Sequence, residues 1–139
     1  MSALEVTVRL FAFIGRAGFA VPRRGAVKVW TTATERQLTD GLAPVLEASG
    51  ARAGLAEIRL SLTPGGKVQS AEIETSCGNP ATDWALVSAL LSGERCPITP
   101  APLREASFLL LVEYAPQDAT AGVTERRSWR RLLVRGSGS

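Results

Sequence analysis

The most informative gap in this sequence is histidine, which is absent from all 139 residues. Histidine is the commonest general base of enzymes and a frequent metal ligand. Catalysis by a Ser/His/Asp or Cys/His arrangement is therefore impossible within one chain. The sequence also has no phosphate-binding loop of the G-x-x-x-x-G-K-[ST] type. These absences argue against an enzyme, and no cofactor or metal is expected.

Cysteine is also scarce, because only Cys77 and Cys96 occur, and two are too few for a zinc site. A disulfide between them would suit an oxidising compartment. They flank a predicted helix that would be about 20 Å long, whereas a disulfide needs Cα atoms within about 7 Å of each other. Two separate thiols are favoured, and a bridge would require the connections to fold back.

Long apolar runs are missing as well, since none approaches the roughly 20 residues of a membrane helix. The start, Met1 to Ala20, lacks the basic segment and apolar stretch of a signal peptide. Two locations stay open. A complete chain is expected in the cytoplasm, and a fragment trimmed from an anchored protein is expected to face the periplasm.

The net charge of +3 comes from one short segment near the C-terminus. This segment surrounds Trp129 and supplies the candidate basic contact surface: Arg126, Arg127, Arg130 and Arg131. One interpretation is contact with nucleic acid or acidic lipid through charge and stacking. The favoured alternative is a solvated strand or helix, so nucleic acid is not expected as a partner.

The N-terminal third predicts two strands and a helix. Apolar and polar residues alternate from Val6 to Leu10, which is typical of a strand. A second short strand is predicted over Val27 to Trp30. A helix is predicted from Thr34 to Ser49, because Thr34 and Gln37 have capping-box spacing and apolar residues follow at helical intervals.

A β-hairpin is predicted from Ile58 to Ile73 around the turn Pro64-Gly65-Gly66. The spacing slips between Val68 and Ala71, which indicates a bulge. In the second strand of this hairpin, Glu72 and Glu74 are expected to face solvent.

Another helix is predicted to start at Asn79 and Pro80, which suit the N-cap and the first helical position. It is expected to end at Gly93, with Asp83 near its positive end. It carries an apolar stripe at helical spacing: Trp84, Val87, Leu90 and Leu91. The tryptophans Trp30 and Trp84 are expected in the core. A last strand is predicted from Ser107 to Tyr114.

The stretch Ile58 to Pro116 resembles the C-terminal domain of the TonB and TolA energy-transducing proteins. The resemblance lies in an ordered set of features rather than in one motif. These are a strand and turn, IRLSLTPGGKV, a second strand leading to TSCGNP, a helix, the proline-spaced CPITPAP and the last strand. The helix predicted from Thr34 to Ser49 lies where the family has its preceding helix.

The elements predicted from residue 34 on follow the order α-β-β-α-β, and the extra N-terminal strands before them lie outside the family's pattern. The resemblance implies an α+β fold, with a small antiparallel sheet packed against two helices. It also implies binding by β-strand addition, in which an extended peptide pairs with an open sheet edge. The implied docking edge is the last strand, through Phe108, Leu110, Val112 and Tyr114. The alternative is that this strand, which is apolar on both sides, belongs to the core.

Three parts are predicted: N-terminal strands over 1–32, a TonB/TolA-like domain over 33–116 and a basic tail over 117–139. The predicted function is non-catalytic protein binding in the bacterial cell envelope, in energy transduction or in a secretion or assembly system. The expected partners are envelope or outer-membrane proteins or a second copy of the chain, and no small-molecule substrate is expected. The alternative function is a cytoplasmic adaptor or nucleic-acid-binding protein that uses the arginine-rich tail.

Overall fold

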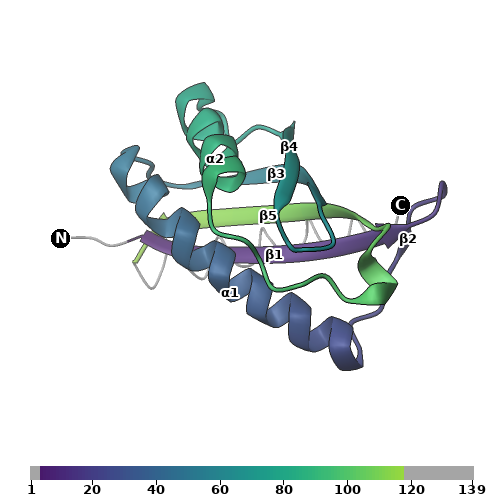
Figure 1. The fold of residues 1–139 in the computed structure, drawn as a ribbon. Coiled ribbons are helices and arrows are strands. Elements are labelled where there is room, and N and C mark those ends of the chain that lie inside the picture. The colour runs from purple at the N-terminus through teal and green to yellow at the C-terminus, as the bar shows by residue number, and fades with distance from the viewer. Residues whose placement is uncertain (1–3, 118–139) are drawn as a thin grey trace.

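The computed structural model describes residues 4–117, which form a five-stranded antiparallel sheet with two α-helices (Figure 1). In chain order the elements are β1 (Leu4–Ile14), β2 (Phe19–Ala20), α1 (Gly25–Ala48), β3 (Gly54–Leu62), β4 (Val68–Thr75), α2 (Pro80–Ser92), the 3-10 turn η1 (Ala101–Leu103) and β5 (Ser107–Pro116). The strand order in the sheet is β2-β1-β5-β3-β4. The predicted α+β class, an antiparallel sheet with two helices, is confirmed. Neither of the two described α-helices combines the length and the apolar character of a membrane span.

The core lies between the sheet and the two helices. Helix α1 packs over β1, α2 packs against β4, and the two helices contact each other (Figure 1). The strands contribute alternate side chains to this side of the sheet, which we call the helix face. The central members of the core are all at most 4% exposed: Leu10, Ile58 and Leu110 from the sheet, and Leu42, Leu46, Leu86 and Leu90 from the helices. Full burial of each such side chain stabilises the fold by about 1.5–3 kcal/mol.

The strand predicted over Val27 to Trp30 is wrong, and so is the helix start predicted at Thr34, because α1 begins at Gly25. Four residues of alternating pattern fit a strand or a helix equally well. Burial decides between them, since Trp30 is 5% exposed and its ring lies 5.7 Å from that of Phe108. Thr34 is buried in the middle of the helix and does not cap it.

The N-terminal segment is built into the same sheet as the rest of the chain. Strand β1 pairs with β5 from Leu4 to Phe13 and lies between β5 and β2. The boundary predicted between residues 32 and 33 falls inside α1. Residues 4–32 therefore supply an inner strand and part of the helix layer. The predicted basic tail, apart from residue 117, lies outside the described residues.

The second half of the chain folds as its local signals predict. Strands β3 and β4 form the hairpin, and Gln69 is the extra residue of the bulge between the pairs Leu62–Val68 and Ser61–Ser70. Helix α2 starts with an N-cap, because the Asn79 side chain accepts hydrogen bonds from the backbone N–H of the first helical turn. It ends at Ser92, one residue before the predicted stop.

Cys77 and Cys96 are both free thiols, as favoured over a disulfide. Cys77 lies before α2, and its thiol donates to the Asn79 carbonyl oxygen at 3.5 Å. Cys96 lies after α2, where its N–H donates to the Gly66 carbonyl oxygen at 2.8 Å. Burial raises the pKa of the Cys96 thiol.

Candidate functional site

The strand predicted as the docking edge is not an edge, which corrects that prediction. Strand β5 pairs with β1 on one side and with β3 on the other, so its backbone groups have no room for an added strand. The four predicted contact residues are core residues and are at most 3% exposed: Phe108, Leu110, Val112 and Tyr114. Apolar character on both sides of a strand is typical of an inner strand, which explains the error.

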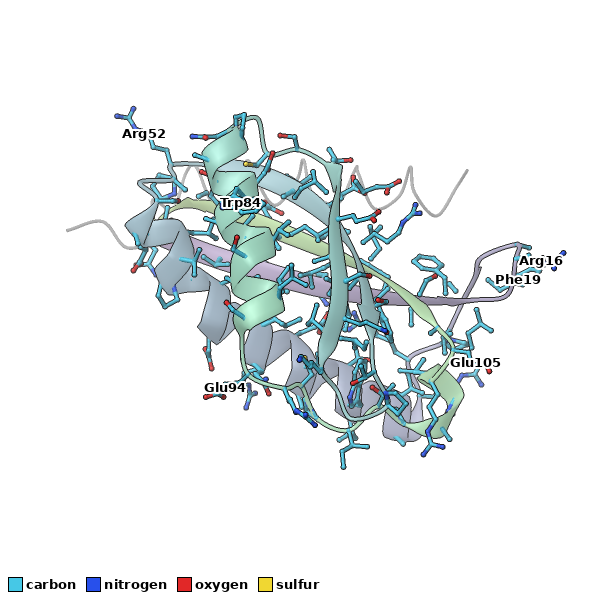
Figure 2. All side chains as sticks on the ribbon, turned by 45° about the horizontal axis from the view of Figure 1, so that its top comes forward. Arg16, Phe19, Arg52, Trp84, Glu94 and Glu105 are labelled. Atoms are coloured by element: carbon cyan, nitrogen blue, oxygen red, sulfur yellow. The ribbon has the colours of Figure 1, made fainter. Side chains whose placement is uncertain are left out.

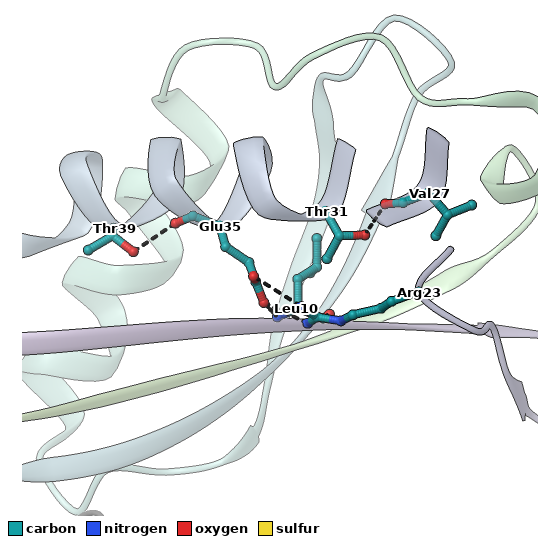
Figure 3. A network of polar contacts seen from close by, with 6 residues as sticks. All are labelled: Leu10, Arg23, Val27, Thr31, Glu35 and Thr39. Carbon is teal, nitrogen blue, oxygen red and sulfur yellow. Dashed lines mark hydrogen bonds and ion pairs between the residues drawn. The ribbon is translucent and has the colours of Figure 1, made fainter. Parts of the chain in front are cut away.

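The β1 side of the sheet is closed by side chains where β2 ends. The Leu10 N–H donates to Glu35 Oε2 at 2.8 Å, and Arg23 Nη2 donates to the Leu10 carbonyl oxygen at 2.8 Å (Figure 3). Arg23 and Glu35 also pair with each other at 2.7 Å. Next along the strand, the Ala12 carbonyl oxygen accepts from the Val21 N–H. The Arg23–Glu35 pair thus takes the place of a neighbouring strand at Leu10.

The β4 side of the sheet has an open edge. Leu10 points its N–H and C=O away from β5. In a row of residues that lie opposite each other across an antiparallel sheet, hydrogen-bonded pairs alternate with non-hydrogen-bonded pairs. Along the row Leu10, Leu110, Ile58 and Ile73, the backbone groups of Ile73 therefore point out of the sheet. Those of Ala71 do the same in the next row. Within residues 4–117, no hydrogen bond reaches this outer side of β4.

An apolar flank of α2 accompanies this edge. Ala89 and Gly93 line the groove that separates α2 from α1, which has a volume of about 650 Å³. At 100° per residue, Trp84 and Leu91 lie on the opposite flank of α2, with Val87 next to them. Helix α2 itself contacts both α1 and β4, and Figure 2 labels Trp84 on the exposed side of this helix.

This flank is exposed rather than buried, which corrects the expectation for Trp84. Trp84 is 72% exposed and Leu91 is 44% exposed. The core side of α2 is instead formed by Leu86 and Leu90. Helix α2 therefore has two apolar sides, and the sheet covers only one of them. Large apolar groups on the other side, such as Trp84, are typical of a contact surface.

The opposite face of β4 is acidic at the same edge. Glu72 and Glu74 are both exposed there, as predicted. Arg59 of β3 pairs with Glu74 at 3.1 Å. Glu57, also on β3, accepts a hydrogen bond from Thr75. In the part of the chain that the structure describes, no ion pair involves Glu72.

A polar cluster fixes the start of α2 against the end of β4. Asp83 is buried and accepts hydrogen bonds from the Ser76 hydroxyl at 2.5 Å and from the Cys77 N–H at 3.0 Å. Burial alone would raise the pKa of Asp83, but these hydrogen bonds outweigh it and lower the pKa below its ordinary value. Burial, followed by the nearby Cys77 and Asp83, raises the pKa of Tyr114. The cluster sets the position of Trp84, the next residue of α2.

Replacement of Asp83 by asparagine is expected to cost about 1–2 kcal/mol of unfolding free energy at neutral pH, because charge-assisted hydrogen bonds are lost. A carboxyl group with a lowered folded-state pKa stabilises the fold above its unfolded pKa, near 4, and loses that contribution as the pH falls through the folded value. The difference between wild type and variant should therefore shrink at about pH 3. Urea unfolding at neutral and acidic pH measures it. Asp40→Asn on the exposed side of α1 is the control, and a pH-independent difference for Asp83→Asn would contradict the assignment.

The other predicted site residues do not join this edge. The candidate basic surface, Arg126, Arg127, Arg130 and Arg131, lies outside the described residues. Cys77 takes part in the polar cluster through its N–H, and Cys96 lies at the other end of α2. The edge residues Ala71 and Ile73 were not predicted, because an edge is defined by the sheet order. The sequence did contain a signal for Trp84. Apolar residues occur on two sides of α2, and a helix that packs on a core with one side needs only one apolar side.

No protein-family model matches the chain, and no curated protein matches it.

Proposed function

We propose that this chain is a non-catalytic protein-interaction module that binds an extended segment of a partner protein by β-strand addition at β4. The observation that carries the proposal is the open outer side of β4, where Ala71 and Ile73 point their N–H and C=O groups away from β3. Unpaired strand edges are ready templates for another chain.

The surroundings of the edge support the same proposal. Helix α2 packs against β4 and exposes Trp84 and Leu91, which offer apolar contacts near the edge. On the β1 edge, Arg23 and Glu35 occupy the backbone groups of Leu10. No such side-chain pair covers Ala71 and Ile73 on β4 within the described residues.

A setting in the cell envelope and kinship with TonB and TolA are parts of this proposal. They are supported by the order α-β-β-α-β from α1 to β5 and by the antiparallel sheet with two helices. In this view the partners are envelope or outer-membrane proteins, and the domain acts on the periplasmic side, in energy transduction or in a secretion or assembly system.

Substitution of Ala71 by proline tests the docking edge. Proline removes the outward N–H of Ala71 without removing a hydrogen bond to β3, so the variant should stay folded. Peptides are first selected against the full chain from a random phage-displayed library, and their affinities are then measured by fluorescence anisotropy. We expect Ala71→Pro to weaken binding about 10-fold or more, since it removes one inter-strand hydrogen bond and adds a ring at the edge.

Ala71→Val is the matched control, because valine keeps the N–H and suits a strand. It should bind the selected peptides within about 2-fold of the wild-type affinity. Trp84→Ala should weaken binding as well, because it removes the largest exposed apolar group beside the edge. Equal affinities for wild type and Ala71→Pro would refute docking at β4, as would a library that yields no binder.

A further inference from the structure

Strand geometry determines which side of β4 each residue of a partner meets. Successive side chains of an added strand point to opposite faces of the sheet, and each contacts the β4 residue with which it pairs. Partner residues opposite Ala71 and Ile73 point to the helix face. The partner residue between them lies opposite Glu72 and points to the opposite face. Glu74 follows Ile73 as the extra residue at the register shift between Glu57 and Ile58.

The helix face of the edge favours apolar partner side chains. Ile73 is half-buried there, and Trp84 and Leu91 are exposed on α2, the helix that packs against β4. An apolar side chain added on this face covers part of these groups, and the removal of apolar area from water is favourable. A charged side chain at the same place would be desolvated without a partner of opposite charge.

The opposite face of the edge favours basic partner side chains. Glu72 and Glu74 both project from β4 on this side, and only Arg59 pairs with either of them within the described residues. Opposite charges directly across two strands attract, and like charges repel. The charge balance at the edge is therefore acidic, although the chain as a whole carries +3.

We infer that the segment bound at β4 alternates apolar and basic side chains, with the apolar ones toward α2 and the basic ones toward Glu72 and Glu74. This inference rests on the proposed docking at β4 and specifies the chemistry of the partner. It also disfavours a second copy of the chain as the occupant. Antiparallel pairing of two β4 strands centred on Glu72 would place the two Glu72 carboxylates opposite each other.

Two synthetic peptides of eight residues, the length of β4, test the inference. One alternates valine and lysine, and the other alternates valine and glutamate. Binding to the full chain is measured by fluorescence anisotropy at low and high salt. We expect the lysine peptide to bind at least about 10-fold more tightly, because two charge pairs change from repulsive to attractive. The preference should shrink at high salt, since these carboxylates are exposed.

Glu72→Lys is the decisive variant, because Glu72 is exposed and its replacement should leave the fold intact. It should abolish or reverse the preference for lysine. Glu105→Lys, an equal change of charge at an exposed position just before β5, should leave it unchanged (Figure 2). Since the chain has a net positive charge, a preference for the lysine peptide reports the local field of the edge and not the total charge.

The outcomes separate the inference from the proposed function. If both peptides bind equally and Ala71→Pro weakens both, β4 is the docking edge and the alternating basic partner is wrong. If neither peptide binds, or if Ala71→Pro has no effect on either, both the inference and the docking at β4 fail. A preference for lysine that survives Glu72→Lys overturns the inference alone. Concentration-dependent dimers that Ala71→Pro disrupts would replace the basic segment with a second copy as the occupant.

Discussion

Replacement of Gly66 by alanine is expected to lower the free energy of unfolding by about 3 kcal/mol or more. Gly66 has a φ of +90°, a left-handed conformation that costs an L-residue about 1–2 kcal/mol. An added Cβ would also lie 2.1 Å from the Cys96 carbonyl oxygen and 2.7 Å from that of Pro97. Both are backbone atoms, so the segment after α2 would have to move away from the hairpin turn. Urea unfolding monitored by tryptophan fluorescence measures the loss.

The neighbouring glycine gives a matched control for this prediction. Gly65 does not have a positive φ, and its added Cβ would first meet the flexible end of the Arg95 side chain at 3.4 Å. Gly65→Ala should therefore stay within about 0.5 kcal/mol of wild type. Equal losses for the two variants would mean that the close approach of Cys96 to Gly66 does not hold the turn.

The parts of the fold that the sequence predicts well are those with local signals. The hairpin of β3 and β4 has a glycine turn and strands of alternating pattern on both sides, all within one short stretch. Helix α2 has Asn79 and Pro80 at its start, and both side chains act within one helical turn. Such signals depend on few neighbours, so they survive without knowledge of the tertiary structure.

The parts that could not be predicted depend on contacts between distant residues. The pairing of Leu4 with Pro116 joins the two ends of the described chain, and no local pattern encodes it. That pairing makes β5 an inner strand and leaves β4 as an edge, so the candidate site depended on information that only the fold contains. The start of α1 failed for a related reason, because Trp30 is buried by Phe108, far away in sequence.

Replacement of Glu35 by alanine is expected to cost about 2–3 kcal/mol of unfolding free energy. The Glu35 side chain is only 13% exposed, and it accepts hydrogen bonds from the Leu10 N–H and from Arg23 (Figure 3). Its removal leaves a backbone donor unsatisfied and a partly buried guanidinium without a counter-ion. The loss falls just below the range of about 3–5 kcal/mol for fully buried pairs, because Arg23 remains 32% exposed. Thermal and urea unfolding measure it.

The same variant tests whether edge protection directs partners to β4. Glu47→Ala is the control, because the Glu47 carboxylate makes one exposed hydrogen bond of 3.4 Å to the Leu4 N–H and its loss should cost under about 0.5 kcal/mol. Once Glu35 is gone, Leu10 presents a free N–H, which lengthens the part of β1 that can pair with another chain. Glu35→Ala should therefore self-associate at concentrations where wild type and Glu47→Ala do not, as sedimentation can show. If Glu35→Ala loses stability but gains no association, the Arg23–Glu35 pair holds α1 on the sheet without guarding its edge.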